Sequence, residues 1–210
     1  MTTAAQSSSA PASKSVRRLK ALVVFGLCVG IAAMVLSVWQ KRHIYHLAVV
    51  QEGILYRDGF KSEGQFAATL ENVHPRTVVS LLDGSEQRDP RKSQFSHEQD
   101  MCSSRGIKLE RIPVSLGGWP SSEDIQQFLT IVSDPKNQPV LVHCAQGVRR
   151  TGFFVAAYQE SVLGYSKAKA ENAILTFGHS DTTVEQIRRF LDGYDPKSRI
   201  VSVSFGRSAE

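Results

Sequence analysis

The sequence predicts an α/β fold with a mainly parallel central sheet flanked by helices, preceded by an N-terminal transmembrane helix. Three observations lead to this prediction. From residue 44 onward, short β-branched apolar runs alternate with segments whose apolar residues recur at helical spacing. One such run, residues 139–142, is uniformly apolar, as in a strand covered on both faces, and leads through a short loop into a buried helix. Nearer the start, residues 21–39 contain no charged side chain.

Composition divides the chain into four segments. Residues 1–19 are predicted to be a disordered tail, because Ser, Ala and Thr dominate the start of the chain and large apolar residues are scarce there. Residues 20–40 are assigned to the transmembrane helix, residues 44–194 to one folded domain, and residues 195–210 to a loose C-terminal tail. A domain of that size can bury a sizeable core.

The elements of the domain follow from the spacing of its apolar residues. The clearest is an amphipathic helix in which apolar residues from Ile125 to Val132 fall at i, i+3, i+4 and i+7. A capping box at Thr182–Glu185 predicts the start of the last helix, after a helix that Gly178 ends. The remaining predictions are a hairpin over 46–50 and 54–57, a helix over 62–73, a strand over 77–82, a weaker helix over 93–105, strands over 107–112 and 139–142, and a helix over 151–158.

Residues 21–39 are long enough to cross a membrane. At about 1.5 Å per residue they cover most of a hydrocarbon layer about 30 Å thick. Trp39, Lys20 and Lys41–Arg42 lie where interfacial anchors belong. A cleaved signal peptide is the competing interpretation, but its apolar region is about 7–15 residues long and ends at small residues, whereas this run ends in Ser37–Trp39. We therefore expect a single-pass membrane protein.

The charge of the chain is unevenly distributed. Six of its 25 Lys and Arg residues lie within residues 1–43, which hold no acid, so the remainder carries 19 cations against 20 acids. The folded part therefore lacks the cationic excess of a nucleic-acid-binding face, and no nucleic-acid partner is expected. Four cations precede the apolar run and two follow it, which favours a cytoplasmic N-terminus and hence a folded domain on the opposite side of the membrane; the small difference leaves that side open.

A cysteine and an arginine separated by five residues follow the strand over 139–142. Cys144 ends this strand, and Arg150 stands at the start of the next helix. Backbone N–H groups in such a loop can converge on one point, and the helix N-terminus adds a positive field there, so the loop favours an anion. The same field lowers the pKa of a thiol below its free value of about 8.5, which makes Cys144 a nucleophile.

Arg150 completes this arrangement, because its planar fork binds two phosphate oxygens at once. The pattern predicts transfer of a phosphoryl group to Cys144 and then to water. Were Cys144 a structural cysteine, the successive cations Arg149 and Arg150 would oppose the helix macrodipole without an anion nearby. The chain has no Gly-Lys-Ser/Thr of a Walker loop and no zinc-ligand spacing, so we expect no metal and no other cofactor.

These residues resemble the cysteine-based protein tyrosine phosphatase superfamily, whose signature His-Cys-x5-Arg-Thr/Ser appears here as residues 143–151. The dual-specificity branch is the most similar. Gly53–Arg57 looks like the family's entry hairpin, and Gly164–Ser166 with the helix beyond it is similar to bacterial members. The resemblance extends more faintly over most of residues 45–193. It implies a phosphatase that acts on phosphotyrosine, and on phosphoserine and phosphothreonine as well, through a cysteinyl-phosphate intermediate.

The resemblance also implies a role for each residue of the loop. Cys144 is the nucleophile, Arg150 binds the phosphoryl group, and the hydroxyl of Thr151 stabilises the leaving thiolate. His143 orients the loop and supports the thiolate. Arg149 either widens the choice of substrates toward multiply charged ones or is a solvated surface cation. The residues expected to bind the substrate phosphate are Ala145, Gln146, Gly147, Val148, Arg149 and Arg150.

The general acid that the family places upstream of the cysteine is missing from the corresponding loop. That loop, Val114–Pro120, contains no carboxylate, although its Gly-Gly-Trp-Pro can form a mobile lid. Asp124 is the nearest candidate beyond it, but Ser121 and Asp124 also have the spacing of a helix capping box. Asp181 is a further candidate that more simply precedes the predicted Thr182 cap.

The sequence leaves the substrate open. A phosphorylated protein is the first expectation, and a phospholipid or an inositol phosphate is the alternative for an anchored domain. A different class of function is a binding module that keeps the phosphate loop but, without an acid, holds phosphorylated partners and does not turn them over. Cys28 lies in the apolar run and Cys102 on a predicted helix, so no structural disulfide is expected.

Overall fold

The computed structural model describes residues 22–35, 46–175, 177, 181–198 and 200–201. The chain divides into two units, Met1–His43 and Ile44–Glu210. In the first unit, residues 22–35 are helical and exposed. Within the described residues no helix has the length and apolar character that crossing a membrane requires, so the predicted transmembrane helix over 20–40 is not confirmed. Both ends of that prediction, and all of the predicted tail over 1–19, lie outside the described residues.

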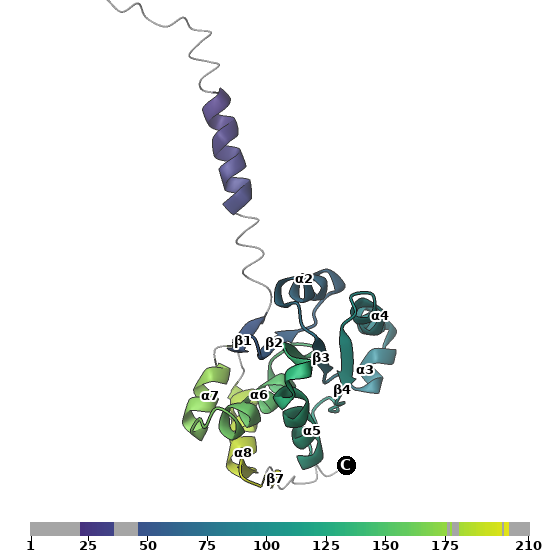
Figure 1. Cartoon of the computed structure of the whole chain (residues 1–210), viewed down its shortest axis with the longest axis vertical. Helices are drawn as coiled ribbons and strands as arrows, with labels where there is room; N and C mark the ends of the chain where they lie inside the picture. The colour runs from purple at the N-terminus through teal and green to yellow at the C-terminus, as the bar shows by residue number, and fades with distance from the viewer. Residues whose placement is uncertain (1–21, 36–45, 176, 178–180, 199, 202–210) are drawn as a thin grey trace, which may run out of the picture. The chain divides into compact units, whose positions relative to one another are not determined.

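A five-stranded sheet forms the centre of the second unit, with the strand order β1-β2-β5-β3-β4 (Figure 1). Strands β2, β5, β3 and β4 are parallel, and β1 pairs antiparallel with β2 across a turn at Gly53, whose φ is +70°. This confirms the mainly parallel sheet and the entry hairpin. The strands are Ala48–Gln51 (β1), Leu55–Gly59 (β2), Thr77–Ser80 (β3), Lys108–Arg111 (β4) and Val140–Cys144 (β5).

Helices cover both faces of the sheet, as Figure 1 shows. On one face, side chains of β5 such as Val140 and Val142 pack with the apolar sides of α5, α6, α7 and α8. On the other face, Val78 and Leu141 pack with Phe66 and Leu70 of α2 and with Cys102 of α4. The helices are Glu63–Val73 (α2), Gly84–Arg88 (α3), Glu98–Ser103 (α4), Ser122–Ser133 (α5), Arg149–Ser161 (α6), Lys167–Leu175 (α7) and Asp181–Gly193 (α8).

The segment between β3 and β4 differs from its prediction. The predicted helix over 93–105 is shorter, because a 3₁₀ turn over Pro90–Phe95 precedes α4. The sequence analysis missed α3 altogether. This helix of five residues is held by a capping box in which Asp83 and Glu86 each accept from the other's backbone N–H. Proline at the first position of the 3₁₀ turn separates the two short helices.

The C-terminal segment was predicted to be loose from residue 195, and that prediction is wrong for its first part. Strand β6 (Tyr194–Asp195) pairs antiparallel with β7 (Ile200–Val201). Asp195 accepts from the Ser198 hydroxyl and the Lys197 N–H, which closes the turn between the strands. Residues 202–210 lie outside the described residues.

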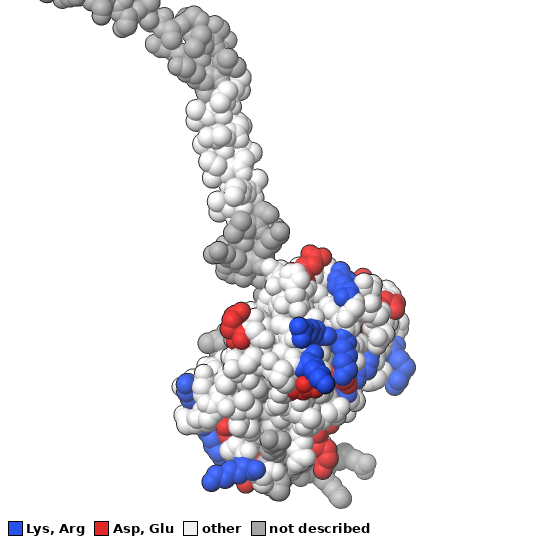
Figure 2. Space-filling model, in the orientation of Figure 1, with Lys and Arg blue, Asp and Glu red and all other residues white. Residues whose placement is uncertain are grey.

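The surface of the domain carries both signs of charge. Figure 2 shows Lys and Arg side chains interspersed with Asp and Glu side chains over the face in view. This distribution agrees with the near balance of 19 cations and 20 acids from residue 44 onward.

Candidate active site

The loop between β5 and α6 is pressed against the end of β2. Gly147 has a φ of +70°, and a Cβ there would lie 2.4 Å from the carbonyl oxygen of Asp58. A Cβ on Gly59 would lie 2.5 Å from the carbonyl oxygen of Gln146. Neither contact can accommodate a side chain, so both positions require glycine. The conformation of the loop therefore depends on close backbone contact with β2, which precedes it in the chain by about ninety residues.

Side chains outside the loop hold its carbonyl groups. His46 Nδ1 lies 2.6 Å from the carbonyl oxygen of Gln146. The buried Arg57 donates from Nη2 to the carbonyl oxygens of Gly147, at 2.6 Å, and Val148, at 3.5 Å. With its carbonyls bound on the outside, the loop turns N–H groups inward, and Gly147 N donates to Cys144 Sγ at 3.2 Å. This is the converging arrangement of N–H groups that the sequence predicted.

The environment of Cys144 favours its thiolate. The side chain is 3% exposed, and burial alone would raise its pKa. The charge of Arg150 outweighs this effect, together with the Thr151 hydroxyl and the backbone N–H groups of Thr151 and Gln146, so that the pKa is lowered. A lowered pKa increases the fraction of thiolate, which is the form in which cysteine acts as a nucleophile.

Three partners hold the side chain of Arg150 in place. Its Nη1 and Nη2 bind the carboxylate of Glu86, with Nη2 2.8 Å from Oε1 and Nη1 in a shorter contact with Oε2. Nη1 also donates to the carbonyl oxygens of Leu81 and Val114, each at 3.1 Å. These contacts use the Nη1 and Nη2 end of the guanidinium, and Nε bonds to no described residue. The edge formed by Nε and Nη2 can therefore bind a phosphoryl group.

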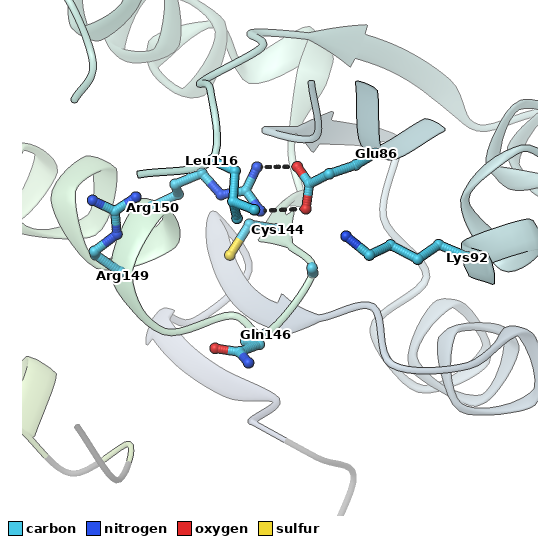
Figure 3. Close-up of a pocket in the computed structure, with 8 residues that line it drawn as sticks. Glu86, Lys92, Leu116, Cys144, Gln146, Arg149 and Arg150 are labelled. Atoms are coloured by element: carbon cyan, nitrogen blue, oxygen red, sulfur yellow. Dashed lines mark hydrogen bonds and ion pairs between the residues drawn. The ribbon is translucent and has the colours of Figure 1, made fainter. Parts of the chain in front are cut away.

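The cavity over Cys144 has a volume of about 340 Å³ and is predominantly cationic (Figure 3). Lys92 extends toward it from one side and Arg149 lies on the other, while Glu86 stays paired with Arg150. The lining residues are Glu86, Lys92, Leu116, Cys144, Ala145, Gln146, Arg149 and Arg150. In the described part of the chain, no cluster of three or more metal-binding side chains occurs.

The predicted site residues fall into two groups. Of residues 143–151, Cys144, Ala145, Gln146, Arg149 and Arg150 line the cavity, whereas the other four do not. Gly147 and Val148 form the outer part of the loop, Thr151 is buried behind Cys144, and His143 lies on β5 with no exposure to solvent.

Arg149 is half-buried and is not a solvated surface cation. It donates to the carbonyl oxygen of Gly117 at 3.1 Å and to the side chain of Gln186 at 3.4 Å. Since Gly117 belongs to the loop Val114–Pro120, Arg149 joins that loop to the loop between β5 and α6. Arg149 therefore connects two loops of the cavity wall, and its side chain also lines the cavity.

Asp124, the candidate general acid, lies in a capping box. Its Oδ2 accepts from Ser121 N at 2.8 Å, and its own N–H donates to Ser121 Oγ at 3.1 Å. It does not line the cavity, to which the loop Val114–Pro120 contributes Leu116. Asp181 is the first residue of α8, and its side chain is outside the described atoms. Among the described lining residues, Glu86 is the only carboxylate, and it is bound to Arg150.

Sequence reasoning missed several residues of the site, for two different reasons. Asp83–Glu86 has the capping-box spacing that was recognised elsewhere in the chain, so this signal could have identified α3 and its Glu86. Lys92 and Arg57 carry no local signal, because each reaches the site from an element that only the tertiary fold brings there.

Asp58 lies beside His143 in the sheet and gives a prediction about stability. Burial raises its pKa to about 6, although the Thr69 hydroxyl, whose Oγ1 is 2.5 Å from Oδ2, favours the ionised form. Because the folded pKa lies above the ordinary value, the associated stability is complete below about pH 4 and is lost as the pH rises through 6. Asp58→Asn should therefore be more stable than the wild type by roughly 1–3 kcal/mol at pH 8, and by little at pH 4.

Urea unfolding at both pH values measures this difference, and Asp100→Asn, an exposed carboxylate of α4, is the control. A difference between Asp58→Asn and the wild type that does not grow with pH would contradict the burial argument.

Comparison with known proteins places this geometry among phosphatases. The family model described as "DSP-PTPase phosphatase fused to NAD+ Kinase" matches residues 51–191. Inositol diphosphatase DSP2 of Oryza sativa subsp. japonica is 32% identical over 120 residues, which cover 55% of this chain and 53% of DSP2. Inositol diphosphatase SIW14 of Saccharomyces cerevisiae is 25% identical over 73% of this chain and 47% of its own length. The chain thus spans about half the length of these relatives.

Solved structures have the same fold. The Siw14 catalytic core has a TM-score of 0.60 at 22% identity and covers 73% of this chain and 87% of its own. TpbA of Pseudomonas aeruginosa, in a complex with phosphotyrosine, has a TM-score of 0.56 at 20% identity and covers 74% and 88%. At these identities the likeness concerns the fold alone.

Proposed function

The chain belongs to the DSP-PTPase family of cysteine-based phosphatases, and from this premise we propose that residues 44–194 hydrolyse phosphoryl groups through a cysteinyl-phosphate intermediate. The observation that carries the proposal is the position of Cys144, whose sulfur accepts from Gly147 N and whose pKa is lowered by the charge of Arg150 and by backbone N–H groups. A nucleophilic sulfur, inward N–H groups and an arginine are the groups that transfer of an anionic phosphoryl group to sulfur requires.

The proposed reaction has two displacements. Cys144 Sγ attacks the phosphorus, a bond from sulfur to phosphorus forms, and the bond to the leaving oxygen breaks. Water then attacks the phosphorus and the bond to sulfur breaks, so that the thiolate is regenerated and phosphate is released as H2PO4⁻, which keeps both protons of the water. The hydroxyl of Thr151, buried behind Cys144, donates to the sulfur as negative charge returns to it. Arg150 binds the equatorial oxygens in both transition states.

The surroundings of the cavity favour a weakly basic leaving group. Its one described carboxylate, Glu86, is bound to Arg150 and is not placed to protonate a departing oxygen. A leaving alkoxide, as from phosphoserine, needs that proton. A leaving phosphate, whose second pKa is about 6, does not, and a phenolate, whose pKa is about 10, needs it less. We therefore place diphosphate groups first among the substrates, and aryl phosphates second.

The cations at the cavity favour a substrate with several phosphates. Lys92 and Arg149 lie on opposite sides of Cys144, so a compact polyanion can meet both while one phosphoryl group enters the loop. We propose an inositol diphosphate as the substrate. Two relatives named inositol diphosphatases support this choice. Phosphotyrosine is the second candidate, supported by the TpbA complex and by the aryl leaving group.

A substrate panel tests this proposal. Full-length protein in chelator should release phosphate fastest from an inositol diphosphate, measurably from an aryl phosphate and a phosphotyrosine peptide, and slowest from a phosphoserine peptide. Lys92→Ala should raise KM for the inositol diphosphate about tenfold and leave hydrolysis of a small aryl phosphate nearly unchanged. Lys136→Ala, an exposed cation outside the cavity, is the matched control.

Three outcomes would change the assignment. Preference for phosphotyrosine peptides over the inositol diphosphate would make the enzyme a protein phosphatase, and preference for a phospholipid would make it a lipid phosphatase. Binding of vanadate without turnover of any substrate would instead identify a phosphate-binding module. An effect of Lys92→Ala on the small aryl phosphate equal to that on the inositol diphosphate would contradict the role of Lys92.

We also propose that residues 21–39 anchor the protein in a membrane. The nineteen uncharged residues and the flanking Lys20 and Lys41–Arg42 support this proposal. The full chain should stay with membranes after alkaline carbonate extraction, and a variant without residues 1–43 should not. Release of the full chain by carbonate would contradict the anchor.

A further inference from the structure

A buried pair of titratable side chains lies next to the nucleophile, on the face of the sheet that α2 and α4 cover. His143 and Glu98 both have 0% exposure, and His143 Nε2 lies 2.8 Å from Glu98 Oε1. Arg111 of β4 donates from Nη1 to Glu98 Oε2 at 3.2 Å, and its own side chain reaches solvent. The first residue of α4 is thus joined to the residue immediately before Cys144.

Three acidic groups around His143 favour its protonated form. Burial opposes a raised pKa of His143, but the close contact and charge of Glu98, followed by the charges of Asp58 and Cys144, raise it. For Glu98, burial is outweighed by His143, the Ser80 hydroxyl and Arg111, so its pKa is lowered. Because a buried charge without a partner is costly, an ionised Glu98 favours the protonated form of His143.

The rest of the wall around His143 is apolar and excludes water. The rings of Phe60 and Phe66 lie 5.8 Å and 4.9 Å from the imidazole, measured between centroids. Leu81 N donates to the His143 carbonyl oxygen at 2.9 Å, which fixes the backbone of β5 at this residue. In such surroundings a charge acts over several ångströms with little screening, and the next residue along the strand is Cys144.

We propose that Glu98 is a positioning residue that keeps His143 as an imidazolium behind the loop, so that a fixed positive charge stabilises the Cys144 thiolate. Glu98 touches neither the cavity nor the reacting atoms and acts through His143. The inference rests on the proposed function only in taking Cys144 as the nucleophile, and it concerns the free enzyme before substrate binds.

Alkylation of Cys144 tests the proposal without any turnover. The rate of iodoacetamide reaction at Cys144, followed by peptide mass spectrometry on the full chain across a pH range, reports the thiolate fraction. Glu98→Gln keeps a hydrogen-bonding group but removes the charge, and it should move the midpoint upward and slow alkylation below the midpoint roughly threefold to tenfold. Glu110→Gln on β4, which removes a carboxylate paired with Lys108, should leave the profile unchanged.

Two further measurements separate positioning from structure. If Glu98 acts through His143, then His143→Gln shifts the profile as Glu98→Gln does, and the double variant adds little. In the wild type, imidazole NMR should show one of the six histidines still protonated above the ordinary titration range of histidine. An unchanged profile in a folded Glu98→Gln would overturn the proposal. A neutral His143 in the wild type would overturn it even if that variant fails to fold.

Failure of the proposed function would look different. If the wild type hydrolyses no substrate but Glu98→Gln shifts the alkylation profile, the inference about Glu98 stands and the proposed phosphatase activity is wrong. A chain that hydrolyses its substrates with a profile indifferent to Glu98 keeps the phosphatase and loses the inference.

Discussion

Cys144→Ser is expected to lower kcat by at least about ten-thousandfold while phosphate and vanadate still bind the loop. The hydroxyl of serine stays protonated at neutral pH. The loop stabilises a negatively charged nucleophile, and serine does not provide one. Loss of a covalent nucleophile removes the whole two-step route, and effects of that size are usual for such residues. Hydrolysis of an aryl phosphate in chelator measures the loss.

Cys28→Ser is the control, because Cys28 is also a free cysteine but belongs to the exposed helix of the first unit. It should retain full activity. If Cys144→Ser kept the activity of the wild type, the assignment of the nucleophile would be wrong and with it the proposed reaction.

Arg150→Lys is expected to lower kcat by about a hundredfold or more and to change KM much less. The guanidinium can bind Glu86 through one edge while its Nε and Nη2 edge faces the phosphoryl group, and an ammonium group has no second edge. In the transition state the equatorial oxygens of the phosphoryl group spread into a plane that the fork matches, so the lost contact belongs to the transition state. Steady-state kinetics on an aryl phosphate separate kcat from KM.

Arg149→Lys is the matched comparison, since Arg149 is the adjacent cation of the same helix and also lines the cavity. Its contact with the carbonyl oxygen of Gly117 needs one donor, which lysine can supply. Its effect on kcat should therefore be small. A larger loss of kcat in Arg149→Lys than in Arg150→Lys would mean that Arg149 binds the phosphoryl group.

The parts of the site that the sequence predicted are those set by local geometry. A strand, a loop of fixed length and a helix N-terminus are consecutive in the chain, so the spacing from Cys144 to Arg150 was enough to place them together. Asp124 illustrates the limit of this reasoning. Its distance from the cysteine was compatible with a catalytic acid, and only the contact with Ser121 shows that its carboxylate caps a helix.

The supporting residues could not be predicted in this way. Glu98 lies on a short helix that precedes His143 by more than forty residues, and nothing in its neighbours distinguishes it from an exposed helical acid. Its burial depends on how α4 packs against the sheet. Arg57 was recognised as part of the entry hairpin, but its role in binding the carbonyls of Gly147 and Val148 depends on β2 pairing with β5.

The contacts of His46 and Arg57 with the loop carbonyls affect how small anions change the stability of the domain. Aligned amide dipoles repel one another when no anion lies between them. Here the free energy of folding compensates this repulsion, so the loop has its binding conformation before an anion enters. An oxyanion that enters the loop needs no rearrangement, so its binding free energy is added to the stability of the folded state. Inorganic phosphate, the product, is such an ion. The enzyme is therefore expected to gain stability from its own product and to be inhibited by it in the same concentration range.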